Sequence, residues 1–199
     1  MNLKEILGSR SSLVTLDHRV AADYGELRTG IKRLKELDYR IVLTQGVWDM
    51  LHEGHLNYLR EARKHGDILI VGVDSDEMTR KRKGPTRPVV SEQERLMMLA
   101  EWRCIDILVV RPDTEDMDDL IKAVEPHELI TSETTKEMTP ETLARLKRFC
   151  GEVVQLKPQA STSTTARIAR LHRDGIGAAI QPLRQLLKDL EELAEGAQS

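Results

Sequence analysis

The feature that most constrains the fold is a series of short apolar runs, rich in β-branched residues, that alternate with amphipathic stretches. The clearest run is ILIVGV at Ile68–Val73, which has no polar residue at alternate positions. A strand of this kind is buried on both faces, as in a parallel sheet with helices on each side. The predicted strands are Ile41–Thr44, Ile68–Val73, Ile105–Val110, Glu128–Thr131 and Val153–Leu156. The alternation therefore predicts an α/β protein with an open, parallel, five-stranded sheet.

The stretches between the predicted strands have helical periodicity and, in several cases, a start signal. SEQE at Ser91–Glu94 has the form of a capping box, and Thr139 followed by Pro140 is typical of a helix start. The predicted helices are His55–His65, Ser91–Trp102, Thr114–Val124, Pro140–Cys150 and Thr164–Arg173. This order predicts a Rossmann-like domain with helices on both faces of the sheet, which we place at residues 39–174.

Both ends of the chain lie outside this predicted domain. Residues 1–38 are expected to form an N-terminal helical extension, and residues 175–199 a C-terminal helix. The apolar positions of the extension are Leu27, Ile31, Leu34 and Leu37. Those of the C-terminal helix are Leu183, Leu186, Leu187, Leu190 and Leu193. Such a stripe packs either on the chain's own core or on a second copy, and the second possibility predicts a homodimer.

Composition restricts the function classes. The chain has 199 residues and a formal net charge of -3, so it has no general attraction to nucleic acid or to an anionic membrane. No apolar run reaches the about 18 residues that span a bilayer, and the first residues have no signal-peptide core. We therefore expect a cytoplasmic protein without a membrane or nucleic-acid partner, whose anion site is local. Cys104 and Cys150 are expected to be reduced core residues.

Two histidines follow the first predicted strand, in the sequence GVWDMLHEGH at Gly46–His55. Ligands of open α/β sheets bind beyond the carboxyl ends of the strands, and this is such an end. His52 and His55 are three apart, so they share a face at the start of a helix, where amide N–H groups attract anions. Gly46 permits a tight turn, and Gly54 leaves room between the imidazoles. The pattern indicates a phosphate site in which both imidazoles donate to a phosphoryl group under attack.

A metal site is the alternative interpretation of the histidine pair. Paired histidines bind zinc, but this spacing differs from the four-residue step of HExxH, and no third Cys or His ligand lies nearby in the sequence. A pair of purely structural histidines is a further possibility.

Two other segments favour a phosphate ligand. RKRKGPTRP at Arg80–Pro88 is expected to form a basic loop after the second strand, on the same edge of the sheet, with Lys83 and Arg87 in it. STSTTARI at Ser161–Ile168 follows the last strand, and its hydroxyl groups could hold phosphate oxygens at a helix start. Basic runs are often solvated surface and hydroxyl residues are often plain caps. Only their combination with the histidine pair indicates a polyphosphate site.

The order of these segments resembles the cytidylyltransferase-like branch of the nucleotidyltransferase superfamily, whose mark is an HxGH motif in a GxFDxxHxGH frame. GVWDMLHEGH, DILIVGVDSDE, KRKGPTRPVVSEQER and STSTTARI occur in that order within residues 40–171. Among members of the branch, KGPTRPV, EQER and STTA are most similar to the adenylyltransferase domain of bifunctional ADP-heptose synthases. The resemblance implies transfer of AMP or CMP from ATP or CTP to a small phosphorylated sugar or alcohol, with release of pyrophosphate. Mg²⁺ is expected to accompany the triphosphate.

The same resemblance implies roles for individual residues. His52, His55 and Lys83 would be the catalytic residues, and Asp49 would orient the site or help to place Mg²⁺. The residues implied to bind the nucleotide are Gly46, Val47, Trp48, Asp49, Gly54, Asp74, Arg87, Arg95, Ser163, Thr164 and Thr165. For Arg95, a structural ion pair is the alternative.

The chain also departs from the family pattern. Trp48 stands where phenylalanine is usual, and TSETTKEMTP at Thr131–Pro140 replaces a Lys-Gly-Gly-Asp segment of the ADP-heptose synthases. Because that segment normally helps to hold the nucleotide or the acceptor, the acceptor of this chain is left open. A nucleotide-binding regulatory protein that has lost transfer activity is the alternative function. A synthetase-like RNA module is disfavoured by the acidic balance and by an aromatic content of 3%.

Overall fold

In the computed structural model, the described residues are 19–114, 116, 118–135, 138–158, 168–171, 173, 174 and 180. The chain divides into two units, residues 1–161 and residues 162–199. The first unit contains the sheet. In the second unit, residues 168–171, 173 and 174 are helical, which confirms the helix predicted at Thr164–Arg173 over its described residues.

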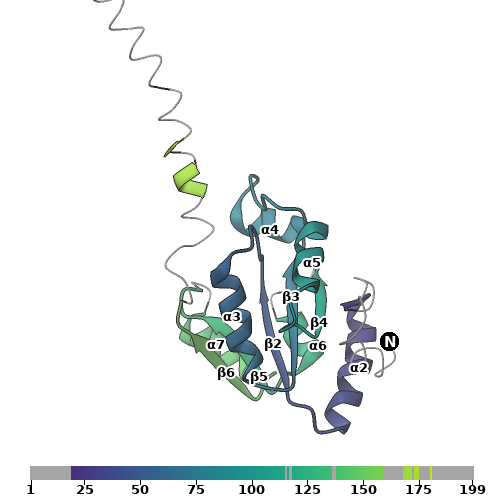
Figure 1. Cartoon of the computed structure of the whole chain (residues 1–199). Coiled ribbons are helices and arrows are strands. Elements are labelled where there is room, and N and C mark those ends of the chain that lie inside the picture. The colour runs from purple at the N-terminus through teal and green to yellow at the C-terminus, as the bar shows by residue number, and fades with distance from the viewer. Residues whose placement is uncertain are drawn as a thin grey trace, which may run out of the picture. The chain divides into compact units, whose positions relative to one another are not determined.

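The first unit is built on a parallel sheet of six strands (Figure 1). In chain order these are β1 (Val20–Ala21), β2 (Ile41–Gly46), β3 (Ile68–Asp74), β4 (Ile107–Arg111), β5 (Glu128–Ser132) and β6 (Glu152–Leu156). Across the sheet the order is β1-β4-β3-β2-β5-β6, and each neighbouring pair is parallel. The predicted fold class is confirmed. The sheet has one strand more than predicted, because the two-residue β1 is too short to show a pattern in the sequence.

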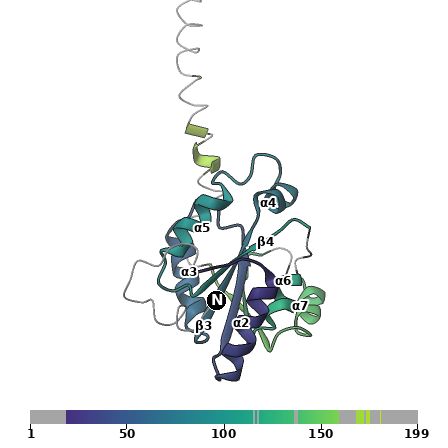
Figure 2. The ribbon, with the colours of Figure 1, turned by 90° about the vertical axis from the view of Figure 1, so that its right-hand side faces the viewer.

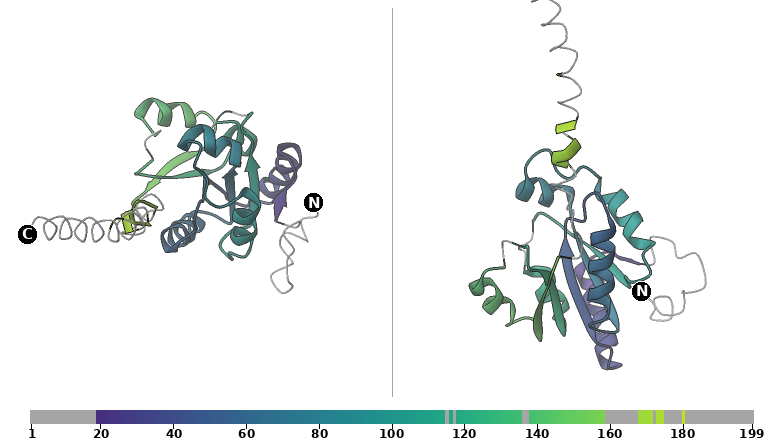
Figure 3. Two further views of the ribbon diagram at one scale, coloured as in Figure 1. Left: turned by 90° about the horizontal axis from the view of Figure 1, so that it is seen from above. Right: turned by 60° about the vertical axis from the view of Figure 1, so that its left-hand side comes forward.

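Helices cover both faces of this sheet (Figure 2). One layer consists of α3 (Glu53–Arg63) and α5 (Glu92–Ala100). The other consists of α2 (Tyr24–Glu36), α6 (Asp119–Val124) and α7 (Pro140–Leu146). Alternate side chains of β2 enter the two cores, with Leu43 packed on the α2 and α6 side and Val42 on the α3 and α5 side. Figure 3 shows the sheet between these layers from above.

The N-terminal helix confirms most of the predicted apolar stripe. Leu27, Ile31 and Leu34 are buried, whereas Leu37 is 56% exposed. The prediction is wrong at Leu37 because the helix ends at Glu36 and Leu37 leaves the helical path as its C-cap. The predicted C-terminal leucine stripe lies outside the described residues, so its packing stays a prediction. Within the described part of the chain, every helix is too short or too polar to cross a membrane.

One helix, α4 (Asp76–Lys83), was not predicted, and it corrects the interpretation of the basic segment. Ser75 caps its start by accepting a hydrogen bond from the Met78 N–H group at 3.0 Å. Acidic residues occupy its first turn and basic residues its last turn, a distribution that the helix dipole favours. Residues 80–83 are therefore helical, and the predicted loop begins only at Gly84, whose φ of 98° ends the helix.

β2 and β5 are the neighbours at which the strand order reverses. Their paired residues lie in the first half of each strand, Val42 with Glu128 and Leu43 with Leu129. Further along, the Tyr58 hydroxyl of α3 donates to the Ile130 carbonyl at 3.1 Å and lies 3.0 Å from the Thr44 hydroxyl, from which it accepts. Burial raises the pKa of Tyr58 to about 12, so the bridging hydroxyl keeps its proton. Ligands of open α/β sheets bind at such a reversal point.

Candidate functional site

The segment between β2 and α3 makes a sharp turn that is held by Trp48. Trp48 and Met50 have positive φ angles of 56° and 48°. This left-handed conformation costs a non-glycine residue on the order of 1–3 kcal/mol. The buried indole of Trp48 stabilises the turn, because its Nε1 donates to the Gly72 carbonyl at 2.9 Å. A side chain at Gly46 would meet this indole at 3.4 Å, so Gly46 lets the ring pack under the turn.

The turn delivers His52 and His55 to the start of α3 as a stacked pair. Their ring centroids are 4.0 Å apart with an interplanar angle of 28°, and Trp48 makes an edge contact with His55 at 5.7 Å. His52 is the N-cap, and its Nδ1 accepts a hydrogen bond from the Gly54 N–H group at 3.0 Å. Nδ1 therefore carries no proton in this arrangement. The neutral ring is protonated on Nε2, which is a hydrogen-bond donor.

The predicted sharing of one helix face by His52 and His55 is thus seen in the structure. The zinc alternative receives no support from the described residues, since none of their His, Cys, Asp and Glu side chains gather in a group of three or more that could hold a metal ion. Cys104 and Cys150 are free thiols. Burial raises the pKa of both thiols, as expected for partly buried reduced cysteines.

Asp49 joins the histidine turn to the loop after α4. Its buried carboxylate accepts hydrogen bonds from the N–H groups of Val89 and Val90 and lies 2.8 Å from Nη2 of Arg87. We refer to Asp49, Arg87, Val89 and Val90 as the Asp49 clasp. The contacts occupy the oxygens that Asp49 would offer to Mg²⁺, so they do not fit a metal-binding carboxylate. The clasp instead holds the loop after α4 beside the histidine turn.

Arg95 lies at the centre of the site as a buried connector. Its guanidinium donates to the carbonyls of Val47 and Asp74, and its Nη2 lies 2.7 Å from the Asp76 carboxylate. Its Nε donates to the Val90 carbonyl at 3.1 Å. The side chain is 0% exposed, and its four partners come from three segments that are separate in the sequence. Of the two roles considered for Arg95, the geometry favours the structural one, in which it holds the walls of the site together.

Asp74, at the carboxyl end of β3, is fully buried between two arginines. Its Oδ1 lies 2.6 Å from Nη1 of Arg111, and its Oδ2 pairs with Nη1 of Arg82. Gly72 gives the Arg111 stem room, since an added Cβ would lie 2.9 Å from the Arg111 Cδ. Lys83, the last residue of α4, is exposed at the end of the same helix as Arg82.

Sequence reasoning missed two members of this arrangement, Arg111 and Asp76, and it placed Arg82 in the basic segment without foreseeing its pairing with Asp74. Arg111 directly follows the apolar run of β4, and an ionisable residue at the carboxyl end of a buried strand is the signal that could have revealed it.

The three predicted hydroxyl residues Ser163, Thr164 and Thr165 lie outside the described residues. Their contact with a nucleotide stays a prediction.

Comparison with known proteins agrees with this geometry. Residues 43–172 match the family model described as cytidylyltransferase-like. The Bifunctional protein HldE of Desulfatibacillum aliphaticivorans is 36% identical over 76% of this chain and 31% of its own length. That of Helicobacter pylori (strain P12) is 37% identical over 72% of this chain, again matching 31% of the relative. The chain thus spans about a third of the length of these curated relatives.

Solved structures of other proteins have a similar fold. A lipopolysaccharide core biosynthesis protein from Thermoplasma volcanium GSS1 is 28% identical, with a TM-score of 0.53 over 59% of this chain and 96% of that one. A pantoate-beta-alanine ligase from Francisella tularensis shares the fold at 14% identity, with a TM-score of 0.54 over 70% of this chain and 66% of that one. Since the family model matches well over half of the residues and includes the histidine turn, this chain belongs to the cytidylyltransferase-like family.

Proposed function

We propose that this protein is a nucleotidyltransferase that moves AMP or CMP from ATP or CTP to a small phosphorylated sugar or alcohol and releases pyrophosphate. The observation that carries the proposal is the stacked pair of His52 and His55 at the start of α3, beside the point where the strand order reverses. Helix N–H groups and imidazole donors together suit the charge that develops on a phosphoryl group during transfer.

The charges around the turn support a triphosphate as the ligand. The guanidinium groups of Arg82 and Arg111 pair with the Asp74 carboxylate, and that of Arg87 pairs with Asp49, so three positively charged groups gather beside the turn. Lys83 adds an exposed ammonium group at the end of α4. Such a surface attracts polyphosphate and can stabilise a leaving pyrophosphate.

In this proposal the reaction is a direct displacement. An oxygen of the acceptor phosphate forms a bond to the α-phosphorus, the bond from that phosphorus to the bridging oxygen breaks, and pyrophosphate leaves with the electron pair. His52, through Nε2–H, and His55 donate to the non-bridging α-phosphate oxygens. Lys83 and Arg87 bind phosphate oxygens, and Ser163, Thr164 and Thr165 are proposed to bind the β and γ phosphates. Catalysis then rests on positioning and charge stabilisation.

Mg²⁺ is proposed as the companion of the triphosphate. It commonly binds through substrate phosphates and water with few protein ligands. We assign it no protein ligand, because the Asp49 carboxylate is engaged in the Asp49 clasp.

The cytoplasmic location and the homodimer are also proposals. Light scattering of the purified protein tests whether it forms a dimer.

The experiment that tests the function is a pyrophosphate-release assay with ATP and CTP, each combined with polyol and sugar phosphates of increasing size. Release that depends on both substrates, and a nucleoside-diphosphate product identified by mass spectrometry, would support the proposal. Tight nucleotide binding without turnover on any acceptor would instead favour the regulatory alternative. His52→Asn serves as the inactive control, because asparagine also caps helices.

A further inference from the structure

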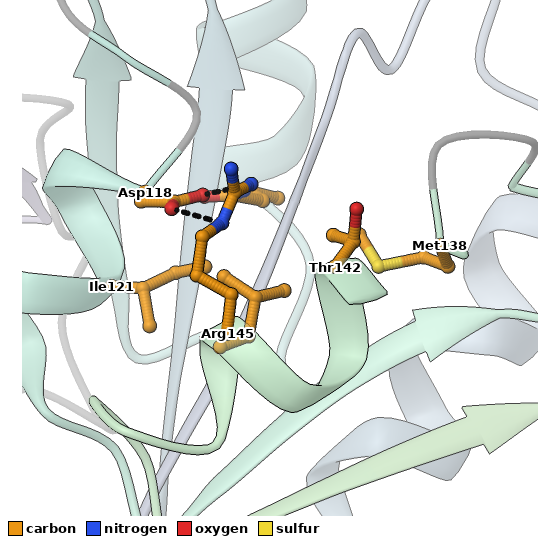
Figure 4. Close-up of a pocket in the computed structure, with 7 residues that line it drawn as sticks. Asp118, Ile121, Met138, Thr142 and Arg145 are labelled. Carbon is orange, nitrogen blue, oxygen red and sulfur yellow. Dashed lines mark hydrogen bonds and ion pairs between the residues drawn. The ribbon is translucent and has the colours of Figure 1, made fainter. Parts of the chain in front are cut away.

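A cavity of about 230 Å³ lies on the sheet face opposite α3, between α6 and α7 (Figure 4). Its polar lining comes from Gln45, Asp118, Thr142 and Arg145, and its apolar lining from Ile121, Met138 and Leu146. The volume is below the about 300–1,000 Å³ typical of sites for drug-sized ligands. A cavity of this size suits a single small polyol or sugar unit.

The cavity adjoins the histidine turn through β2. Gln45 is the next-to-last residue of this strand, and Gly46, from which the turn to His52 begins, follows it directly. Because successive residues of a strand point to opposite faces, Gln45 enters the cavity on the α6 and α7 side, whereas Gly46 lies toward Trp48 and α3. The cavity and the histidine turn thus both adjoin the carboxyl end of β2, on its two faces.

The charges in the lining are paired with each other. Nε of Arg145 lies 2.9 Å from Oδ2 of Asp118, and Nη2 of Arg145 donates to Oδ1 at 3.3 Å (Figure 4). The pair leaves the lining without net charge, so it offers no excess attraction for a phosphate. Each partner keeps free hydrogen-bonding capacity, because a carboxylate accepts about four bonds and a guanidinium donates five.

The chemistry of the lining fits hydroxyl groups. Gln45, Asp118 and Arg145 supply planar groups that donate or accept hydrogen bonds. The Thr142 hydroxyl can donate and accept, and the apolar side chains can pack on the C–H groups of a ligand. Thr131 is on the same face of β5, two residues beyond the Leu129 that pairs with Leu43. Its buried hydroxyl has no hydrogen-bond partner among the described residues, which leaves a further polar group in this region.

Resting on the proposed function, we infer that this cavity binds the hydroxylated body of the acceptor, a polyol or a single sugar unit, while the acceptor's phosphate lies at the histidine turn. Gln45, Asp118, Thr142 and Arg145 are then the residues that determine acceptor specificity. The inference also accounts for the departure at Thr131–Pro140, because Met138 belongs to that segment and lines the cavity, and α7, which supplies further lining residues, begins at its last residue.

The experiment uses the full chain and three variants. Thr142→Phe fills the cavity but keeps the backbone N–H that Thr139 caps. Gln45→Leu removes the amide from the opposite wall and is the second test if Thr142→Phe does not fold. Arg148→Ala, an exposed change two residues beyond the end of α7, is the matched control. Transfer kinetics and calorimetric binding are measured with glycerol phosphate and with six- and seven-carbon sugar 1-phosphates, and nucleotide binding is measured separately.

We expect Thr142→Phe to raise the KM and Kd of the acceptor at least about tenfold, and Gln45→Leu to raise them about fivefold, the effect of losing one net hydrogen bond. The nucleotide Kd and all Arg148→Ala values should stay within about twofold of the parent. Folded Thr142→Phe and Gln45→Leu variants with parental acceptor KM would overturn the inference and leave the function intact. A parent that binds a sugar phosphate without transfer, and loses binding in Thr142→Phe, would overturn only the function. A parent that neither transfers to nor binds any acceptor overturns both.

Discussion

Asp49 and Arg87 form a partly buried ion pair, with 2.8 Å between Oδ2 and Nη2, that joins the histidine turn to the loop after α4. The two residues are far apart in the chain, and the N–H groups of Val89 and Val90 complete the clasp. The position of the loop after α4 therefore depends on one carboxylate of the GVWD segment.

Removing this carboxylate should destabilise the protein and weaken nucleotide binding. Asp49→Ala leaves two backbone N–H groups and a largely buried guanidinium without their acceptor, so we expect a loss of at least about 1–3 kcal/mol in the free energy of unfolding. Asp113→Ala is the matched control, because it removes the partner of Lys81 in an exposed pair worth about 0–1 kcal/mol. Urea unfolding and nucleotide titration measure both effects, and equal losses in the two variants would contradict the role of the clasp.

Arg95 should be irreplaceable by lysine. A lysine ammonium cannot contact Val47, Asp74, Asp76 and Val90 from one buried position, because the guanidinium reaches them with a planar fork. Breaking such a buried arrangement is expected to cost about 3–5 kcal/mol. Arg103→Lys, at an exposed position shortly after α5, should change the urea midpoint little. A midpoint for Arg95→Lys that equals the parental value would show that the four contacts contribute no stability.

Most of the sheet could be predicted from the sequence, since the buried strands are apolar runs and the helices between them show their periodicity and caps. The misses have physical causes. β1 has two residues, and α4 is so rich in charge that its helical pattern is hidden behind the basic run at its end. There the cap of Ser75 and the order of acidic and basic residues were the usable signals.

The candidate site was predictable only where its geometry is local. The shared face of His52 and His55 follows from their spacing on one helix. The partners of Asp74 and Arg95 cannot be predicted from local spacing. Arg111 is 37 residues from Asp74, and Val47 is 48 residues from Arg95. Such pairs arise when strands and loops assemble, and no short sequence pattern encodes them. The cavity between α6 and α7 could not be predicted either, because its lining residues come from segments that are distant in the sequence.

His52 should have two separable roles, one as a helix cap and one toward the phosphoryl group. His52→Ala loses both, so we expect turnover to fall by about two to three powers of ten and stability by about 1 kcal/mol. His52→Asn can accept the bond from the Gly54 N–H group, so it should recover the stability but not the turnover. Urea midpoints and initial rates compare the two variants. Recovery of full turnover in His52→Asn would mean that the imidazole does not act on the phosphate.

Stability should fall in acid because of two groups where β2 and β5 begin. Nδ1 of His127 accepts a hydrogen bond from the Ile41 N–H group at 2.9 Å, which requires an unprotonated nitrogen. Burial lowers the pKa of His127, with Lys35 and Arg40 acting in the same direction. Its contribution is therefore complete above the usual value of 6.5 and is lost as the pH falls below it.

Glu128 adds a second acid-sensitive step. Burial alone would raise its pKa, but hydrogen bonds from Arg40 and His65 outweigh burial and lower it. A lowered carboxyl pKa gives stability that is present above the usual value of 4.5 and is lost below it. Urea midpoints of the parent and of His127→Gln, measured from pH 7 to about pH 3, separate the two steps. The glutamine side chain can accept the Ile41 bond without titrating, so the variant should lose less stability than the parent between pH 7 and pH 5. Identical pH profiles would exclude His127 as the source of the first step.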